Sequence, residues 1–179
     1  MSSYQSETTQ WAYVALGSNL GDSARILQQA IERLRDFSTQ PMLVSSLWQT
    51  APVDCPPGSP GFVNAVVGFL PNPDETPESL LKKLQALETE FGRKPKAVTN
   101  EPRPLDLDLI AFENERRNSP ELILPHPRAH QRRFVLQPLS EIAPDLVLPG
   151  QPATVVKLLA RLASDDFVTK ISRLGTGAT

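Results

Sequence analysis

The chain has 179 residues, 40% of them hydrophobic, and this predicts one domain with a substantial core. Its formal net charge is -2 and its pI is about 5.7, which excludes a globally basic surface, so binding to nucleic acid would need a local basic patch. The single cysteine, Cys55, excludes an intramolecular disulfide and favours a reducing compartment. No apolar stretch is long enough to span a bilayer and no signal-peptide pattern is present, so we expect a cytoplasmic protein without a membrane partner.

The first part of the chain predicts a strand followed by a helix. Residues 12–16 form a short apolar run, which ends in the cluster of turn residues 17–21. A helix then begins with Asp22 or Ser23 as its cap, and Pro41 lies beyond its end. The apolar face of this helix consists of residues at helical spacing, namely Leu27, Ala30, Ile31 and Leu34.

Two strands and a second helix come next. The strands are predicted over residues 43–49 and 62–70, and they flank the loop 51–61, which is rich in proline and glycine. A capping hydroxyl, a proline and an acid at residues 76–78 predict a helix start, and Gly92 is the natural C-terminal stop. The buried stripe of this helix is predicted to be Leu80, Leu84, Leu87 and Phe91.

The remainder of the chain completes the fold class. A loop over residues 93–102 leads into a strand with two aspartates, and we predict a later helix over about residues 154–162 and a last strand near residues 167–171. The order strand, helix, strand, strand, helix, strand predicts an α+β, ferredoxin-like domain, with helices on one face of a mostly antiparallel sheet and additional C-terminal elements. We expect the chain to consist of a flexible N-terminal extension (1–10), a single domain (11–174) and a flexible tail (175–179).

Two aspartates lie two residues apart inside an apolar segment. Because side chains alternate between the faces of a strand, Asp106 and Asp108 project from one face while the neighbouring leucines point to the other. Two carboxylates this close repel each other unless a cation lies between them, and oxygen ligands on a rigid strand suit Mg²⁺. The pair therefore favours a divalent metal site. The alternative is a half-exposed strand whose polar face is acidic.

Cationic side chains flank this strand. They are Arg93, Lys94 and Lys96 in the preceding loop, Arg103 next to the strand, and Arg128, Arg132 and Arg133 downstream of His126. Metal-binding carboxylates among separated cations are what a polyphosphate requires, although any one arginine on its own is better explained as a solvated loop residue. The glycine turn 17–21 lacks the lysine followed by serine or threonine of a Walker A motif, so it does not identify a phosphate loop.

An aromatic ring and an amide share one face of the strand 62–70. The same alternation places Phe62 beside Asn64, a pair suited to a flat, polar ring, and Phe134 is a candidate for the opposite face of the stack. Alternatively, both phenylalanines belong to the core. An asparagine among apolar neighbours must have its amide paired, so Asn64 is either structural or a ligand contact.

Several ordered blocks resemble the 6-hydroxymethyl-7,8-dihydropterin pyrophosphokinase family, whose members move pyrophosphate from ATP to a pterin alcohol in the folate pathway. The resemblance covers nearly the whole chain apart from its ends. The blocks are Val14-Ala15-Leu16-Gly17-Ser18-Asn19-Leu20-Gly21, Thr50-Ala51-Pro52, Phe62-Val63-Asn64-Ala65, Glu88-x-x-x-Gly92-Arg93, Pro102-Arg103-x-Leu105-Asp106-Leu107-Asp108, Pro125-His126-Pro127-Arg128 and Arg132-x-Phe134-Val135-Leu136-x-Pro138-Leu139.

The resemblance implies a ferredoxin-like fold and a role for each matching residue. It implies two Mg²⁺ ions, held by Asp106 and Asp108, that bridge ATP and substrate. Contacts to ATP are implied for Gln85, Glu88, Arg93, Arg103, His126 and Arg132, with Arg93, Arg103, Asp106 and Asp108 as the catalytic set. The pterin contacts are implied for Phe62 and Phe134 as the two faces of the stack, Asn64 at the polar edge, and the backbone of Thr50, Ala51, Pro52 and Val53.

The loop 93–102 departs from the family pattern. Many members carry Arg-x-Arg after the glycine, with a further basic residue and a tryptophan later, whereas this chain has Arg93-Lys94-Pro95-Lys96, then Thr99-Asn100, and Glu101 in place of a small residue. Lysine keeps the charge but not the bidentate fork of arginine. We predict that this loop is mobile without ligand and orders over bound MgATP.

The reaction expected from the resemblance is in-line attack of the pterin hydroxymethyl oxygen on the β-phosphorus of MgATP, with AMP as the leaving group. Positioning and charge neutralisation would carry the rate, and no side chain is an obvious general base. We expect ATP and the pterin alcohol as the only partners, no nucleic acid, and a monomer or weak homodimer. Two alternatives are a metal-dependent phosphohydrolase and an RNA-binding ferredoxin-like module, although the RNP pattern and the basic charge of the latter are absent.

Overall fold

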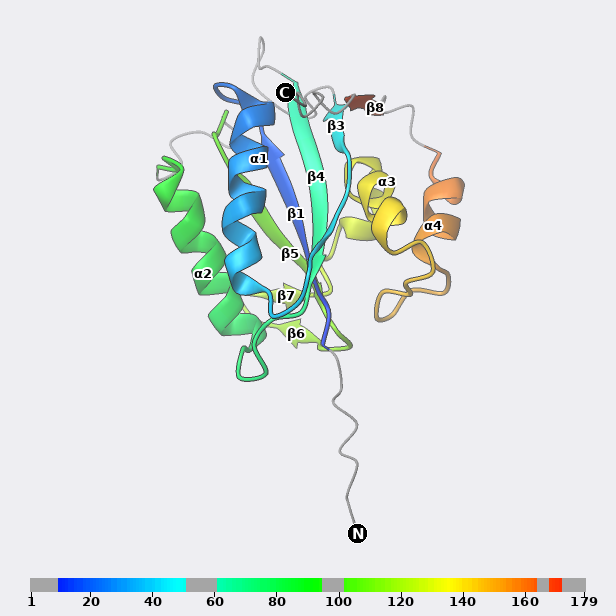
Figure 1. Cartoon of the computed structure of the whole chain (residues 1–179). Helices are drawn as coiled ribbons and strands as arrows, with labels where there is room; N and C mark the ends of the chain where they lie inside the picture. Colours follow the sequence, from blue (N-terminus) through cyan, green and yellow to red (C-terminus); the bar gives the residue numbers. More distant parts are fainter. Residues whose placement is uncertain (1–9, 51–60, 95–101, 164–167, 172–179) are drawn as a thin grey trace.

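The computed structural model describes residues 10–50, 61–94, 102–163 and 168–171, and Figure 1 shows their arrangement. The strands are β1 (Ala12–Ser18), β2 (Leu43–Val44), β3 (Leu47–Thr50), β4 (Phe62–Phe69), β5 (Asp106–Phe112), β6 (Arg117–Asn118), β7 (Ile123–Leu124) and β8 (Val168–Ile171). The α-helices are α1 (Ser23–Leu34), α2 (Pro77–Glu90), α3 (Arg133–Ile142) and α4 (Val155–Arg161), and short 3₁₀ helices are η1 (Arg35–Phe37) and η2 (Ala129–Gln131).

The prediction of an α+β, ferredoxin-like fold is confirmed. Within the described residues, six strands form one sheet in the order β5-β1-β4-β3-β8, and β2 also pairs with β4. Every neighbouring pair in this sheet is antiparallel. α1 connects β1 to β3 across β4, and α2 connects β4 to β5 across β1. This is the split arrangement expected from the order of elements.

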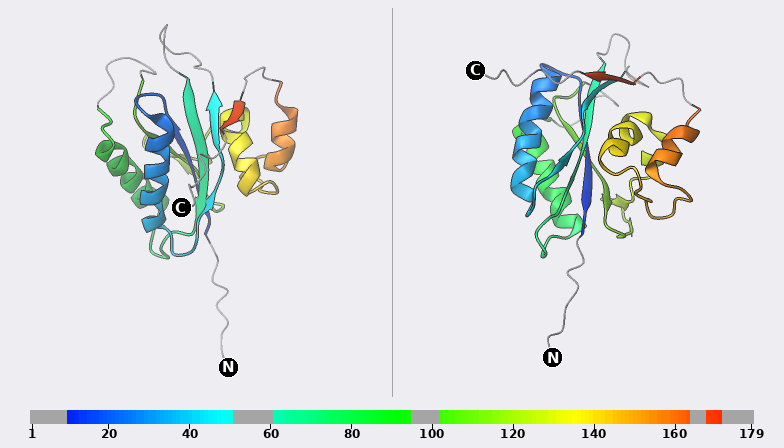
Figure 2. Two further views of the ribbon diagram at one scale, coloured as in Figure 1. Left: turned by 45° about the horizontal axis from the view of Figure 1, so that its top comes forward. Right: turned by 45° about the vertical axis from the view of Figure 1, so that its right-hand side comes forward.

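Helices cover both faces of the sheet, whereas the sequence predicted helices on one face. Figure 2 shows the sheet nearly edge-on, with α1 and α2 on one side and α3 and α4 on the other. Each side has its own buried cluster, the first built on leucines of α1 and α2 and the second on Val135, Leu136 and Leu139 of α3 and Val155 and Leu158 of α4. The additional C-terminal elements thus bury the second face. Among the described helices, none has the length and apolarity needed to cross a membrane.

Strand alternation directs the polar residues of interest to the α3 side. On β5, Leu107 and Leu109 join the cluster under α1 and α2, so Asp106 and Asp108 point to the opposite face. On β4, Ala65 and Val67 join the same first cluster, which leaves Asn64 on the α3 side. The acids and the amide therefore lie on one face, on strands separated only by β1.

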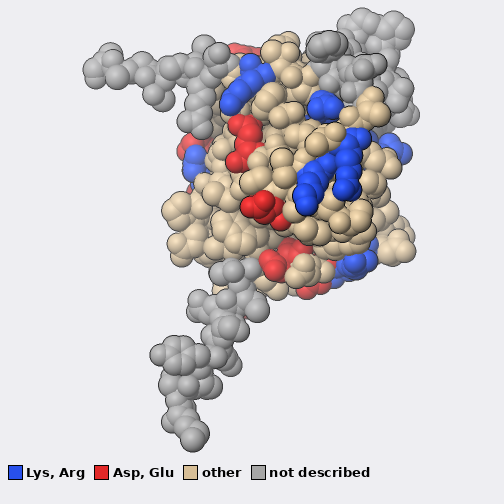
Figure 3. Space-filling model, turned by 90° about the vertical axis from the view of Figure 1, so that its right-hand side faces the viewer, with Lys and Arg blue, Asp and Glu red and all other residues tan. Residues whose placement is uncertain are grey.

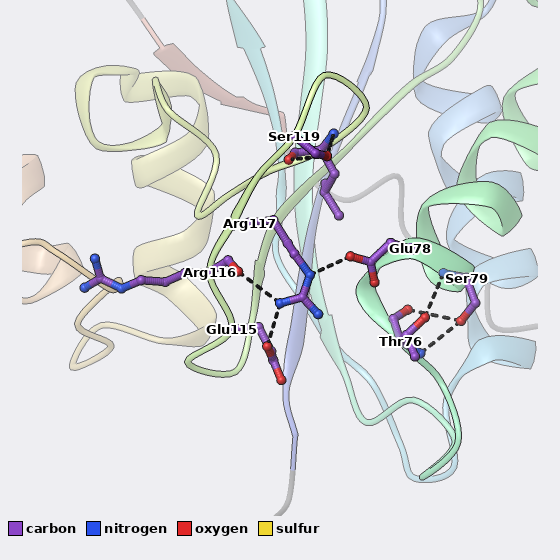
Figure 4. A network of polar contacts seen from close by, with 8 residues as sticks. Thr76, Glu78, Ser79, Glu115, Arg116, Arg117 and Ser119 are labelled. Atoms are coloured by element: carbon purple, nitrogen blue, oxygen red, sulfur yellow. Dashed lines mark hydrogen bonds and ion pairs between the residues drawn. The ribbon is translucent and has the colours of Figure 1, made fainter.

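The two predicted N-terminal helices form as their caps indicate, and their predicted apolar stripes are buried except for Phe91, which is the half-buried C-cap of α2. The Asp22 side chain accepts from the N–H of Arg25, and the four predicted core positions of α1 are buried. In α2, Thr76 and Ser79 form a capping box, and Gly92 follows the helix with φ of 95°. Figure 4 shows this helix start next to the β6–β7 hairpin, where Arg117 donates to Glu78.

The structure departs from the predicted elements at four places. The strand predicted over 43–49 is divided at Ser45 and Ser46 into β2 and β3, and the first strand extends to Ser18 instead of ending at residue 16. The hairpin β6–β7 and the helix α3 were not predicted. α3 contains Pro138 in its interior, a residue that normally marks the end of a helix, so sequence pattern alone disfavoured it.

Candidate active site

Asp106 and Asp108 lie at the start of β5, surrounded by charged groups from three segments. The Oδ1 atom of Asp106 accepts a hydrogen bond of 3.0 Å from Nη1 of Arg93, and Nη1 of Arg103 lies 3.6 Å from the same oxygen. The Asp106 side chain is 24% exposed, so these cations face a partly buried carboxylate. Arg93 and Arg103 thus balance the negative charge of Asp106, which a bound metal ion would also balance.

Glu88 links α2 to this cluster. It is buried, and its Oε2 atom accepts from the backbone N–H of Leu107 at 3.0 Å and pairs with the Arg93 guanidinium. Burial raises the pKa of Glu88, although the Leu107 N–H and the Arg93 charge oppose this effect. Burial alone would lower the pKa of Arg93, but the charges of Glu88 and Asp106 outweigh it and raise the pKa. Glu88 therefore holds Arg93 against the start of β5.

The surroundings of Asp108 disfavour its charged form. Burial first, and then the charges of Asp106 and Glu88, raise the pKa of Asp108 to about 7, against the opposing effect of Arg132 and Arg103. A bound cation would remove this penalty, so the donor set fits a divalent ion. Within the described residues, no group of three or more His, Cys, Asp or Glu side chains is placed to hold a metal ion. The candidate site offers two carboxylates, and a bound substrate would fill the remaining coordination positions of the ion.

His126 and Arg132 approach the acids from the segment between β5 and α3. The backbone N–H of His126 donates to the carbonyl of Ile110 at 2.9 Å, and its Nδ1 atom accepts from the N–H of Arg128 at 3.2 Å. Burial and the Arg132 charge lower the pKa of His126, which favours its neutral ring. Burial also lowers the pKa of Arg132, with Asp108 acting in the opposite direction. The guanidinium of Arg132 therefore lies in a partly desolvated position near Asp108.

Gly17 of β1 separates the acid pair on β5 from Asn64 and Phe62 on β4. Asn64 is 5% exposed, and its Nδ2 atom donates to Oγ1 of Thr50 at 2.9 Å. In the strand register, Gly17 pairs with Asn64 on one side and with Asp106 on the other. A Cβ atom at Gly17 would lie 3.3 Å from Oδ1 of Asn64 and 3.8 Å from the Phe62 ring, so the absence of a side chain leaves this surface open.

The other predicted site residues are placed less centrally. Phe134 is half-buried on α3, packs against the second core cluster, and has the Arg132 guanidinium 5.3 Å from its ring centre. Gln85 lies on an exposed part of α2, one turn before Glu88. The predicted backbone contacts at Ala51, Pro52 and Val53 lie outside the described residues, as do Lys96 and most of the loop 93–102. Arg133 donates to the carbonyl of Leu162 and so joins α3 to the end of α4.

Two residues at the site were not singled out from the sequence. Gly17 was assigned to the turn, although it lies within β1, and a glycine inside a strand is a known signal for close approach of a ligand or chain. Asn19 was assigned to the same turn but is 1% exposed and contacts Arg103. Nearby, a pocket of about 260 Å³ is lined by Leu20, Gly92, Arg93, Lys94, Pro102, Arg103 and Pro104.

Comparison with known proteins gives matches along most of the chain. A 2-amino-4-hydroxy-6-hydroxymethyldihydropteridine pyrophosphokinase of Haemophilus influenzae is 36% identical over 90% of this chain and 98% of its own length. One of the same name from Pseudomonas aeruginosa is 41% identical over 78% of this chain and 85% of its own length. The folic acid synthesis protein fol1 of Pneumocystis carinii is 35% identical over 87% of this chain, which spans only 20% of that longer protein.

The fold has close counterparts among solved structures. The wild-type HPPK-DHPS of Plasmodium falciparum superposes with a TM-score of 0.66 at 14% identity, over 88% of this chain and 42% of the Plasmodium chain. This match supports the fold only, because its sequence identity is low. The fold and the curated relatives together define the chain as a pyrophosphokinase. The model of the 7,8-dihydro-6-hydroxymethylpterin-pyrophosphokinase family matches residues 13–144, and the chain belongs to this family.

Proposed function

We propose that this chain transfers pyrophosphate from MgATP to the hydroxymethyl group of 6-hydroxymethyl-7,8-dihydropterin and releases AMP, with the cluster around Asp106 and Asp108 as the reaction centre. The observation that carries the proposal is the placement of this acid pair beside Arg93 and Arg103 on the sheet face that also presents Asn64. A polyphosphate site and a site for a flat polar ring are thereby neighbours, as transfer between the two substrates requires.

Asp106 and Asp108 would hold the magnesium, and two ions are proposed from the family resemblance. Bound there, the metal would supply charge neutralisation at the phosphate oxygens. The chain's own part is to present two carboxylates in partly buried positions. Burial, and then the charge of Asp106, raise the pKa of Asp108, and a bound cation would favour its charged form.

The arginines are proposed to bind the polyphosphate. Arg93, Arg103 and Arg132 each lie close enough to the acids to affect them, and guanidinium groups bind phosphate oxygens in a fork. Binding of ATP would draw Arg93 and Arg103 away from Asp106, because the nucleotide offers them other negative charge. His126, Gln85 and Glu88 complete the proposed nucleotide contacts, with Glu88 as the group that positions Arg93.

The pterin is proposed to lie against β4 and the start of α3. Phe62 and Phe134 would form the two faces of the stack, and the Asn64 amide would meet the polar edge of the ring. The hydrogen bond from Asn64 to Thr50 fixes the amide orientation, which leaves the Oδ1 atom directed toward the open surface at Gly17. The backbone of residues 51–53 is proposed to add contacts to the ring.

The reaction is a single displacement. The hydroxymethyl oxygen forms a bond to the β-phosphorus of ATP, the bond from the β-phosphorus to the oxygen of the α-phosphate breaks, and AMP leaves with that oxygen. The hydroxyl proton passes to solvent, since no described side chain of the site is assigned as a base. The protein's residues bind and orient the two substrates and compensate charge, which is sufficient for phosphoryl chemistry of this type.

The structure disfavours the RNA-binding alternative. RNA-binding modules of this fold class use an open sheet face, whereas here helices cover both faces of the sheet. On the α4 side of the molecule, acidic and basic side chains lie near one another on the surface (Figure 3). The oligomeric state, monomer or weak homodimer, and the cytoplasmic setting stay predictions.

One incubation tests the proposal against the phosphohydrolase alternative. The protein is supplied with MgATP and 6-hydroxymethyl-7,8-dihydropterin, and the products are separated by liquid chromatography. We expect AMP and pterin pyrophosphate in equal amounts. Release of inorganic phosphate or pyrophosphate with the pterin unchanged would show a hydrolase and overturn the proposal.

A further inference from the structure

Asn19 is a buried polar residue next to the proposed reaction centre, and the function proposed above gives it no role. It directly follows β1 and is 1% exposed. Its backbone N–H donates to the carbonyl oxygen of Arg103 at 3.1 Å, and its side-chain Oδ1 atom accepts from the backbone N–H of Arg103 at 2.8 Å. One asparagine thus holds both backbone hydrogen-bonding groups of a residue that is 84 positions further along the chain.

The sequence around Arg103 explains why this contact matters. Pro102 and Pro104 lack a backbone N–H, so Arg103 provides the single backbone donor of the segment 102–104. The ladder between β1 and β5 ends at the pair Gly17 and Asp106, before this segment is reached. Asn19 therefore continues the connection between the two strands where regular pairing has stopped, and it fixes the backbone from which the Arg103 side chain extends.

The Arg103 side chain has an unused donor. This side chain is 15% exposed, and its Nη1 atom lies 3.6 Å from Oδ1 of Asp106. Within the described part of the chain, Nε of Arg103 and Nδ2 of Asn19 are both buried without a hydrogen-bond partner. Buried donors of this kind normally find an acceptor in a ligand or in water. The pocket of about 260 Å³ that Arg103 lines together with Arg93 and Lys94 has room and positive charge for an anionic group.

We propose that Asn19 is a positioning residue for the transfer reaction, because it fixes Arg103 where its guanidinium meets a phosphate oxygen of the nucleotide. The inference rests on the proposed function and adds a residue to it. Asn19 acts through Arg103, and the Nε atom of Arg103 receives its partner from the nucleotide. Loss of the Asn19 side chain leaves the Arg103 N–H unpaired and frees the segment 102–104 to shift.

A double-mutant cycle tests this role. The affinity for an ATP analogue with a methylene group between the α- and β-phosphorus is measured by calorimetry, with Mg²⁺, for wild type, Asn19→Ala, Arg103→Ala and the double variant. We expect Asn19→Ala to weaken binding by about tenfold or more in the wild-type background and to add nothing in the Arg103→Ala background. A loss of equal size in both backgrounds, or an affinity within about twofold of wild type in folded Asn19→Ala, would overturn the inference.

Controls separate this result from loss of fold and from failure of the proposed function. Asn118→Ala changes an exposed asparagine on β6 and should leave the affinity unchanged. If circular dichroism shows that Asn19→Ala does not fold, the cycle is run with the smaller change Asn19→Ser and interpreted in the same way. A wild-type protein that binds the analogue but forms no AMP and pterin pyrophosphate would refute the proposed function, while the cycle would still decide the role of Asn19.

Discussion

At the scale of single residues, Asp108 has a carboxylate whose charge the protein alone disfavours. Burial raises the pKa of Asp108 to about 7, with Asp106 and Glu88 adding to the effect. Asp108→Asn keeps the shape and removes the charge, so we expect unchanged or higher thermal stability without Mg²⁺. The same change removes a proposed metal ligand, and AMP formation should fall by several orders of magnitude. Thermal unfolding and a product assay measure the two effects.

The exposed Asp145 provides the matched control for this substitution. Asp145→Asn has the same chemistry at a position away from the acid pair and should leave turnover unchanged. Turnover close to wild type in Asp108→Asn would remove Asp108 from the metal site.

The pKa of Asp108 also predicts a pH dependence of stability. The ordinary pKa of an aspartate is 3.8, so between this value and about 7 the folded protein retains a proton that the unfolded chain has released. Stability from this group therefore decreases as the pH rises through that window, and the loss is complete above it. Without Mg²⁺, the melting temperature of Asp108→Asn minus that of wild type should increase from about pH 4 to about pH 7. Parallel curves for the two proteins would show that Asp108 titrates normally.

Local sequence information predicted some of these residues and not others. The alternation of a strand suffices to place Asp106 and Asp108 on one face, because that geometry depends only on residues two apart. The contacts of Arg93 with Asp106, and of Asn19 with Arg103, depend on how β1, α2 and β5 pack together. No periodic pattern carries that information, so these contacts became visible only in the structure.

At the scale of elements, Glu141 joins α3 to the edge of the sheet. Its carboxylate accepts from the backbone N–H and hydroxyl of Ser46 and from the indole N–H of Trp48, and Lys170 of β8 lies 3.6 Å away. Glu141→Ala removes these hydrogen bonds, but water can reach the exposed donors, so we expect a loss of about 1 kcal/mol in the free energy of unfolding. Urea denaturation measures this loss.

Glu121 is an exposed carboxylate in the hairpin region, and Glu121→Ala serves as the control with an expected change near zero. Equal stability of Glu141→Ala and wild type would mean that apolar packing alone docks α3. The helix itself shows why its prediction failed. Pro138 interrupts the usual pattern, yet Val135, Leu136 and Leu139 are buried against the sheet, so tertiary packing outweighs the local cost of the proline.

At the scale of the whole molecule, one sheet is shared by two helical layers. Strong caps and apolar stripes predicted α1 and α2, and the element order predicted the antiparallel sheet that both helices cover on one face. It did not predict that the C-terminal elements would bury the second face. The proposed site lies on that second face, so α3 and its N-cap residue Arg132 pack at the site as well as against the core, and Arg132 and Phe134 are proposed ligand contacts.

Because the site draws residues from β1, β4, β5, α2 and α3, its ligands bind only the folded chain and should stabilise the whole domain. A ligand at a hundred times its dissociation constant adds about 2.7 kcal/mol, which corresponds to a rise of about 5–10 °C in melting temperature for a chain of this size. We expect this rise with the methylene ATP analogue in the presence of Mg²⁺ and a much smaller rise with EDTA. In Asp106→Ala the difference between the two conditions should disappear, since one proposed metal ligand is gone. Equal rises with Mg²⁺ and with EDTA in wild type would show that the nucleotide binds through the arginines alone, and the proposed metal site would have to be abandoned.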